Sequence, residues 1–415
     1  MNVFQVLLIT FIVSVEAKST SQADNAAQPR SLKSEMYVES SVANDNICNN
    51  HEKNVAFDVI LFEKKSHNES KIRKKRQAPY DNRIEYKNRP RSDQKSLVIV
   101  FDATGSMHDD LEQLRAGAKQ IVTELSARDD NPIFNYILVV YRDPTVEPAF
   151  QTKNPDDLLA KLKQIQTIGG GDCAEYALTG LKVALQLALP NSLAYVFSDA
   201  TAKDLAYYEE VLGLIQKKQA TVNFLLTGDC DDPAGPGYQV YVKLSRASNG
   251  QVYDMNKSNV KDVLLAIRHT VNYNYAALTS VDADSAGTSN TKLNVDKSIS
   301  ELSVSLSGKN PRLTITDPMN ETVKSGEELS LMNLKLVKIK DPVDGLWNVE
   351  TEAESSHSIR LGGISDLKFD FGFSTEVPEK KSETSFQPLA SVQNILSIFV
   401  IDPSCHNHSL SIKFS

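Results

Sequence analysis

Five oxygen-bearing side chains stand beside short apolar runs or helical patterns of this sequence. They are Asp102, Thr104, Ser106, Glu175 and Asp199. The first three alternate with other residues directly after the continuous apolar run 97–101, and the other two lie in separate segments further along the chain. Carboxylate and hydroxyl oxygens are the ligands that hard divalent cations prefer. The residue types therefore indicate a cation site, with Mg²⁺ as the expected ion and Mn²⁺ or Ca²⁺ as alternatives.

These side chains need a fold that brings three separate segments together. From Ser96 to Val271, short apolar runs alternate with amphipathic helical patterns, which is typical of an α/β fold with a doubly wound, mostly parallel sheet. We predict strands at 97–101, 136–141, 194–197 and 222–226, and helices at 109–126, 156–166, 174–187, 202–218 and 259–271. Ligands bind at the carboxyl edge of such sheets, so we expect the three loops to converge there.

The number of these ligands leaves room for a partner. Two hydroxyls and one or two carboxylates, bound directly or through water, leave Mg²⁺ short of its preferred octahedron and with a net positive charge. An acidic side chain of another protein can complete the coordination. The alternative is a pocket without a cation, in which Asp102 and Asp199 only accept hydrogen bonds.

The motif resembles the metal-ion-dependent adhesion site of von Willebrand factor A domains, whose form is Asp-x-Ser-x-Ser plus residues from two other loops. Thr104 replaces the first serine and retains its hydroxyl, and Asp199 fills the third loop. The run Asp172-Cys-Ala-Glu175 is similar to the Asp-x-Pro-Glu of integrin β-subunits, which implies Glu175 as the second-loop ligand. The same resemblance makes three residues candidates for an adjacent cation: Asp109, Asp110 and Asp172. Two acidic residues in the first turn of a helix are equally what the helix dipole favours.

Further motifs, in order along the chain, resemble the N-terminal portion of hemicentins. They are Gly-Gly-Gly-Asp172-Cys173, Tyr195-Val-Phe-Ser-Asp199, Leu226-Thr-Gly-Asp229-Cys230, Gly345-Leu-Trp347, His357-Ser-Ile-Arg360 and Phe371-Gly-Phe-Ser374. Hemicentins are extracellular-matrix proteins in which an A domain and a sandwich-like segment precede a long array of immunoglobulin domains. The resemblance covers about residues 95–375 and does not extend to the array, so it implies an A domain at 95–275 and no role that the array carries.

A different pattern begins after Tyr275. Apolar residues alternate with serine, threonine and aspartate, which indicates strands, as in Leu302-Ser-Val304-Ser-Leu306. We predict a small antiparallel β-sandwich over 276–375, with strands at 312–316, 334–339, 346–351, 358–361 and 367–373. Residues 376–415 are expected to form a linker to 391, one more strand at 395–401 and a tail. A lone strand cannot bury its face, so it either docks on the sandwich or belongs to something longer.

The ends of the sequence and its cysteines favour an exported protein. Residues 1–17 have the form of a signal peptide that is cleaved after Ala17. We predict that residues 18–94 form a pro-segment and linker, which is cut after Arg76 at the basic site Arg-Lys-Lys-Arg, residues 73–76. Cys173 and Cys230 follow strand-like segments of one domain, so we pair them in a disulfide and leave the pairing of Cys48 and Cys405 open. The glycosylation sequons are Asn68, Asn256, Asn320 and Asn407.

Composition narrows the function classes. The net charge of −8 argues against a nucleic-acid binder, and no run is long enough to span a membrane. No zinc-protease helix, nucleophile elbow or phosphate loop is present, so an enzyme would need a site that we do not recognise. We expect a secreted protein of the extracellular matrix or fluid that binds an acidic residue of a matrix or cell-surface protein. A soluble decoy of matrix adhesion, without the immunoglobulin array, remains the alternative.

Overall fold

The computed structural model describes residues 94–128, 131–171, 173–230, 232–272, 274–323, 326–365, 368–378, 381–385, 392, 394–401 and 408–414. Within these residues one compact unit ends at Ser365, and a second begins after it. The expected signal peptide, pro-segment and cleavage sites, with Ala17, Asn68 and Arg76, lie outside the described residues.

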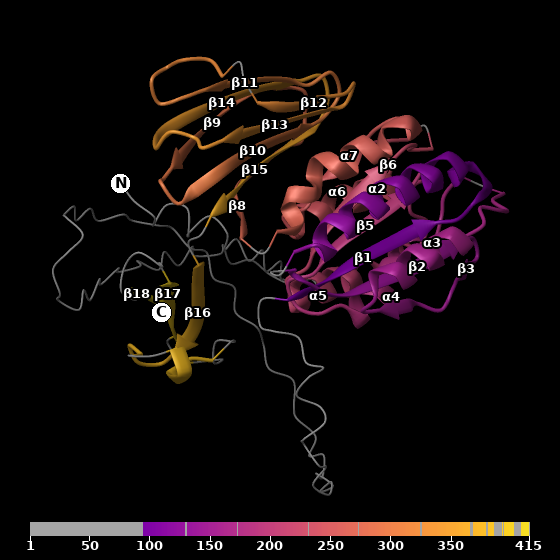
Figure 1. Ribbon diagram of the computed structural model, residues 1–415, viewed down its shortest axis with the longest axis horizontal. Coiled ribbons are helices and arrows are strands. Elements are labelled where there is room, and N and C mark those ends of the chain that lie inside the picture. The colour runs from indigo at the N-terminus through magenta and orange to yellow at the C-terminus, as the bar shows by residue number, and fades with distance from the viewer. Residues whose placement is uncertain are drawn as a thin grey trace, which may run out of the picture. The chain divides into compact units, whose positions relative to one another are not determined.

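The first compact unit begins with an α/β domain built on a mostly parallel sheet (Figure 1). Its strands are β1 (Lys95–Asp102), β2 (Ile133–Arg142), β3 (Thr145–Val146), β4 (Phe150–Thr152), β5 (Leu193–Ser198), β6 (Thr221–Leu226) and β7 (Val252–Asp254). The order across the sheet is β3-β2-β1-β5-β6-β7, and β4 pairs with β2. Only β3 and β4 run antiparallel to their neighbour β2. This arrangement confirms the predicted α/β fold. It buries β1 on both faces, as a strand this apolar requires.

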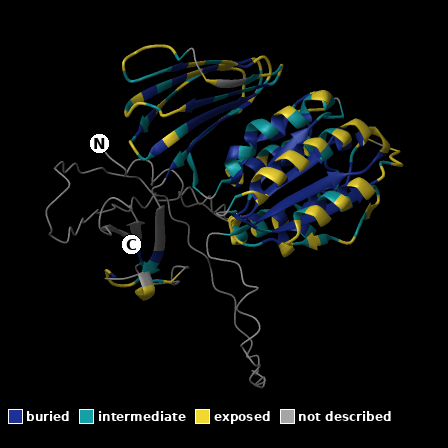
Figure 2. Cartoon of the chain, viewed as in Figure 1, coloured by how far each residue is buried: buried dark blue, intermediate teal, exposed yellow. Residues whose placement is uncertain are grey.

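Helices cover both faces of this sheet. They are α2 (His108–Ser126), α3 (Pro155–Gln164), α4 (Ala177–Leu187), α5 (Tyr208–Lys218), α6 (Pro236–Ala247) and α7 (Val260–Ile267), with short 3₁₀ turns η2 (Gly105–Met107), η3 (Leu205–Tyr207), η4 (Lys257–Asn259) and η5 (Arg268–Val271). Leu97, Ile99 and Phe101 of β1 pack with α2, α3 and α7, whereas Val98 and Val100 pack with α4, α5 and α6. Figure 2 shows the resulting dark, buried sheet between helices that expose only their outer sides.

Four elements of the α/β domain were absent from the sequence prediction: the short strands β3, β4 and β7 and the helix α6. Helix α6 begins with Pro236 at its first position, where a missing N–H costs nothing, and we had not recognised that start signal next to Gly235 and Gly237. Strand β7 has only three residues, too few to show a period in the sequence. Strand β7 is the edge strand of the sheet on the side that meets the next domain.

The second domain is a sandwich of two antiparallel sheets. One has the strand order β12 (Glu327–Ser330), β13 (Leu334–Lys340), β10 (Ile299–Ser307), β15 (His357–Ser365) and β8 (Tyr275–Ala283). The other has β11 (Arg312–Thr316), β14 (Gly345–Ala353) and β9 (Gly287–Val295). Leu302, Val304 and Leu306 meet Trp347 and Val349 in the shared core. Trp347, only 2% exposed, therefore anchors this core.

The serine face of β10 is buried, although alternation predicts that it faces water. Ser305 Oγ donates a hydrogen bond of 2.7 Å to Gln251 Oε1, and Ser307 Oγ donates one of 2.5 Å to the carbonyl of Val252. Leu334 and Leu336 of β13 join the apolar cluster that contains α7. These contacts pack the sandwich directly against the β7 edge of the α/β domain.

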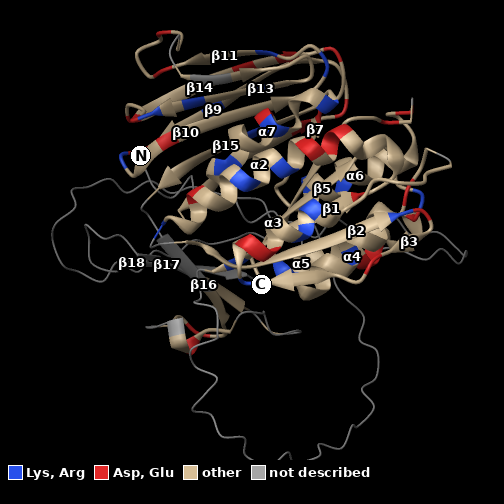
Figure 3. Cartoon of the chain, turned by 45° about the vertical axis from the view of Figure 1, so that its right-hand side comes forward, with Lys and Arg blue, Asp and Glu red and all other residues tan. Residues whose placement is uncertain are grey.

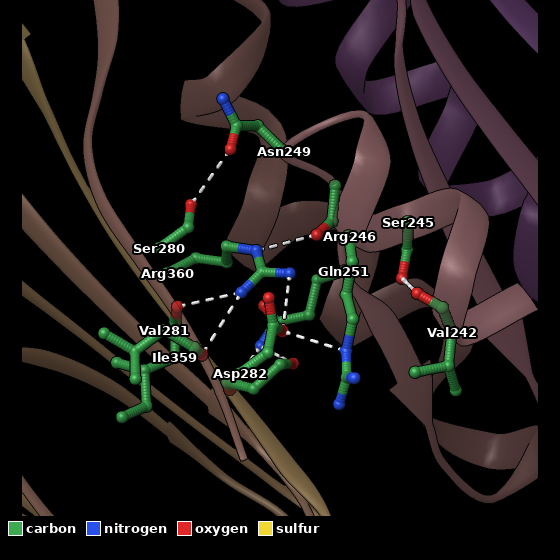
Figure 4. A network of polar contacts seen from close by, with 12 residues as sticks. Val242, Ser245, Arg246, Asn249, Gln251, Ser280, Val281, Asp282, Ile359 and Arg360 are labelled. Atoms are coloured by element: carbon green, nitrogen blue, oxygen red, sulfur yellow. Dashed lines mark hydrogen bonds and ion pairs between the residues drawn. The ribbon is translucent and has the colours of Figure 1, made fainter. Parts of the chain in front are cut away.

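Arg360 is a buried charged residue of this contact (Figure 4). Its Nε donates to the carbonyl of Gly250 at 2.8 Å, and its guanidinium lies 3.0 Å from Asp282, which also faces Arg246. Only 8% of Arg360 is exposed, so this charge depends on its partners for stabilisation.

We expect Arg360→Met to lower the free energy of unfolding by about 3 kcal/mol, because it leaves the Gly250 carbonyl and Asp282 without the charged donor. Thermal unfolding measures this as a drop in Tm of roughly 6–12 °C. Arg312→Met is the matched control, since Arg312 pairs with Glu352 on the same domain while 77% of its side chain is exposed. Equal Tm values for the two variants would contradict the structural importance of Arg360.

The last described strands form a separate sheet in the second compact unit. Its order is β16 (Lys368–Ser374), β17 (Asn394–Ile401) and β18 (His408–Phe414), with a 3₁₀ turn, η6 (Lys381–Glu383), between the first two. We had placed the strand at 367–373 in the sandwich, but it pairs with β17 instead, and the sandwich unit ends at Ser365. The strand expected at 395–401 is therefore paired on both sides.

Candidate metal centre

Asp102 ends β1 and is fully buried. Its Oδ1 accepts hydrogen bonds from the N–H of Thr104 at 3.0 Å and from the Thr104 hydroxyl at 2.9 Å. Its Oδ2 accepts one of 3.0 Å from the hydroxyl of Ser198, the last residue of β5. The carboxylate is thus held rigidly between two neighbouring strand ends.

Thr104 and Ser106 continue the first loop into η2. Their hydroxyl oxygens lie 3.4 Å apart, with Thr104 buried and Ser106 exposed. The glycine run folds over this loop, and the N–H of Gly105 donates to the carbonyl of Gly169 at 3.0 Å. Gly169 and Gly170 have φ angles of +78° and +94°, a conformation that favours glycine. The run therefore shapes the loop around the site.

Glu175 comes from the second loop, before α4. It is 2% exposed, its Oε2 accepts a 3.1 Å hydrogen bond from the N–H of Asp143, and its backbone bridges to Ala202 in the loop after β5. Asp143 in turn forms an ion pair with Lys203. The side chain is therefore buried at the carboxyl edge of the sheet, where the sequence placed it.

Asp199 follows β5 and lies beside a lysine that we had not considered. Its Oδ2 is 2.6 Å from Nζ of Lys257, which also lies 3.3 Å from Oδ2 of Asp110. A Cβ on Gly228 would meet the carbonyl of Asp199 at 2.3 Å, so only glycine permits this approach of the loop after β6. No sequence spacing pointed to Lys257, because 151 residues separate it from Ser106. The sequence shows Ser198 next to Asp199, but it does not indicate the hydrogen bond that Ser198 donates to Asp102.

The residues proposed for a neighbouring cation have different positions. Asp109 is exposed in the first turn of α2, while Asp110 is 1% exposed and its Oδ1 accepts a 2.7 Å hydrogen bond from Thr227. The buried Oδ2 of Asp110 has no hydrogen bond, only the ion pair with Lys257. Asp172 lies outside the described residues.

The donor set fits a hard cation that is bound partly through water. Among the residues that the structure describes, no three carboxylate, imidazole or thiol side chains meet at a point where they alone would hold a metal ion. The site instead combines the carboxylates of Asp102, Glu175 and Asp199 with the hydroxyls of Thr104 and Ser106. Oxygen-only ligands and the buried, unbonded Oδ2 of Asp110 match Mg²⁺, which keeps several waters in proteins.

Burial and mutual repulsion raise the pKa values of two of these acids. Burial, opposed by hydrogen bonds from Thr104 and Ser198 and aided by the charge of Asp199, raises the pKa of Asp102 to about 6. Burial and the charge of Asp102 raise the pKa of Glu175 to about 7. The metal-free protein therefore holds protons here that a bound cation would displace.

We expect the metal-free protein to lose stability as the pH rises from about 4 to 7. The folded pKa of Asp102, about 6, exceeds its ordinary value of 3.8, so between these values the folded state binds a proton that the unfolded state has released. Ionising Asp102 alone should cost about 3 kcal/mol. Urea unfolding in chelator at pH 4.5, 5.5 and 7 measures the slope, and Asp102→Asn should reduce it to the part that comes from Glu175, whose pKa is also raised. An identical slope in that variant would refute this assignment.

The remaining predicted residues can be placed in part. Cys173 and Cys230 form a disulfide, with Cα atoms 5.7 Å apart, that ties the loop of Glu175 to the loop after β6. Asn256 and Asn320 are exposed, while Asn407, Cys48 and Cys405 lie outside the described residues. The loop of Asp199 contacts this disulfide through hydrogen bonds from Thr201 to the Sγ of Cys230.

Comparison with known proteins agrees with the fold. A model of the von Willebrand factor A domain matches residues 96–257, and a model of the hemicentin galactose-binding domain-like domain matches residues 276–366. The chain thus contains an A domain followed by a galactose-binding-like domain. Human hemicentin-1 is 38% identical over 302 residues, which cover 72% of this chain, and mouse hemicentin-2 is 35% identical over 331 residues, which cover 79%. The chain belongs to the hemicentin family.

The chain matches only a small part of these relatives. It spans 5% of the length of human hemicentin-1 and 6% of mouse hemicentin-2. Mouse von Willebrand factor A domain-containing protein 7 is 28% identical over 333 residues, covering 74% of this chain and 36% of the relative. Among solved structures, proximal thread matrix protein 1 of the mussel byssus, with a zinc-occupied MIDAS motif, has a TM-score of 0.32 and 14% identity over 47% of this chain and 50% of that chain.

Proposed function

We propose that this protein is a secreted binding protein whose A domain holds a divalent cation and uses it to capture an acidic side chain of another protein. Asp102, Thr104, Ser106, Glu175 and Asp199 would hold Mg²⁺, with Mn²⁺ or Ca²⁺ as substitutes. The cation would supply a positively charged coordination position that a carboxylate can fill.

One observation carries this proposal. Asp102 and Glu175 are buried at the carboxyl edge of the sheet, with exposed fractions of 0% and 2%, and Asp199, whose side chain is 12% exposed, directly follows the neighbouring strand β5. Burying like charges together costs stability unless a cation compensates them. Such a cluster at the carboxyl edge of a parallel sheet is better explained by a bound cation than by hydrogen bonding alone.

The partner is proposed to be a protein of the extracellular matrix or of the cell surface. Family membership supports a place in the matrix, and the disulfide supports an oxidising compartment. Figure 3 shows acidic and basic positions interleaved along the helices, which fits a protein partner better than nucleic acid. No helix of the described residues is long and apolar enough to cross a membrane. A soluble decoy of matrix adhesion uses the same site and differs only in where the protein accumulates.

Calorimetry with Mg²⁺ and Mn²⁺ tests the metal site, and binding to matrix extracts with and without chelator tests the partner. We expect binding of at least one cation below millimolar concentration and loss of matrix binding in chelator. Equal matrix binding in both conditions would exclude the metal-dependent function. Recovery of the secreted protein from the insoluble matrix, rather than from the soluble fluid, distinguishes a matrix component from a decoy.

A further inference from the structure

Lys257 places an ammonium group within the acidic site from a distant part of the chain. It begins η4, the 3₁₀ turn between β7 and α7. Its Nζ lies 2.6 Å from Oδ2 of Asp199, 2.6 Å from the carbonyl oxygen of Ser106 and 3.3 Å from Oδ2 of Asp110. The ammonium group thus donates hydrogen bonds to the first two oxygens and forms an ion pair with the third.

Two of these contacts involve residues that we assign to the cation. Asp199 offers its carboxylate to Lys257, and Ser106 offers its backbone carbonyl. Mg²⁺ needs oxygen ligands at close to 2.0–2.1 Å. An ammonium group bound to the same carboxylate would compete with the divalent cation for the carboxylate oxygen. The two positive groups would also repel each other.

Lys257 is also the most exposed of the three charged side chains in this contact. Its side chain is 34% exposed, compared with 12% for that of Asp199 and 1% for that of Asp110. A lysine side chain is a flexible four-carbon stem that can turn its charge outward to water. The acids cannot leave the site in this way, because they lie beside the strand ends.

We propose that Lys257 is a tethered competitor of the divalent cation: its ammonium group neutralises Asp199 and Asp110 in the metal-free protein and has to leave when the cation binds. This inference rests on the proposed metal site and adds a residue that sets its affinity. The apparent affinity for the cation equals the intrinsic affinity multiplied by the fraction of time that the ammonium group leaves the site free. A lysine that is bound nine-tenths of the time weakens the apparent affinity about tenfold.

The test is a titration of the full chain with Mn²⁺ and with Mg²⁺ by calorimetry, for the unchanged protein and for Lys257→Met. We expect the variant to bind both ions about tenfold more tightly. Lys261→Met is the matched control, because it removes the same charge four residues further on, from a side chain that is only partly exposed, and should change the affinity less than about twofold. Lys257→Gln provides a second, polar replacement if the methionine variant does not fold without a cation.

Thermal unfolding gives an independent readout. In chelator, Lys257→Met should have a lower Tm than the unchanged protein, because Asp199 and Asp110 lose their counter-charge, and saturating Mg²⁺ should raise its Tm by more. Unchanged or weaker cation binding in both Lys257 variants would overturn the competitor role while leaving the metal site intact. Absence of binding in every variant would instead refute the proposed function, and the competitor role with it.

Discussion

Replacing Asp102 by asparagine is expected to weaken Mg²⁺ binding at least about 100-fold, because changes of groups that merely support a metal ligand already cost 10–100-fold. Asparagine keeps the shape of the side chain and an oxygen that can accept the Thr104 hydrogen bonds, while its NH₂ group replaces the oxygen that accepts from Ser198. It removes the negative charge that a cation needs. Titration calorimetry with Mg²⁺ measures the loss, and capture of an acidic partner should fall with it by about 2–5 kcal/mol.

The same variant should be more stable than the unchanged protein when both are metal-free at pH 7. Ionised Asp102 is fully buried beside Asp199 and Glu175, so its charge opposes folding until a cation is present. Mg²⁺ at 100 times its Kd should add about 2.7 kcal/mol to the unchanged protein and almost nothing to Asp102→Asn.

Two other aspartates make the comparison specific. Asp109→Asn changes an exposed residue in the first turn of α2 and should alter Mg²⁺ affinity far less than Asp102→Asn does. Asp262→Asn, on the exposed surface of α7, should leave the Mg²⁺ affinity unchanged. If all three variants lose affinity equally, the effect is one of overall charge and Asp102 is not a ligand.

Removing the disulfide is expected to cost about 4 kcal/mol of stability, from the entropy of the loop that it closes. The bond joins residues 57 positions apart, Cys173 and Cys230, and its loss frees the unfolded chain. Replacing both cysteines by serine avoids an unpaired thiol. Denaturant unfolding of this double variant, compared with the unchanged protein, measures the difference.

The disulfide should also affect the metal site. Cys173 is two residues from Glu175, and the Sγ of Cys230 accepts a 3.3 Å hydrogen bond from the N–H of Thr201, two residues after Asp199. We therefore expect the double serine variant to bind Mg²⁺ more weakly, measured without denaturant at a temperature where the variant remains folded. Full stability without the disulfide would show that the packed core alone fixes these loops.

Much of the fold could be predicted from local patterns. The continuous apolar run of β1 identified a strand buried on both faces, and the alternating run of β10 identified one face of the sandwich core. Patterns failed where an element was too short, as in β7, or where partners came from far away, as in β16. The serines of β10 are the clearest case, because alternation cannot tell a polar face in water from one that bonds another domain.

The sequence by itself placed Asp102 and Asp199 at strand ends, because a strand boundary and a side-chain type are local properties, and the family resemblance pointed to Glu175 before a helix. Asp102, Glu175 and Asp199 needed no structure to be singled out. Only the tertiary structure decided what surrounds them: the hydroxyl of Ser198 on Asp102, the close approach of Gly228 to Asp199, and the ammonium group of Lys257. These contacts join segments far apart in the chain, and their existence depends on how strands and loops pack, which no spacing of residues encodes.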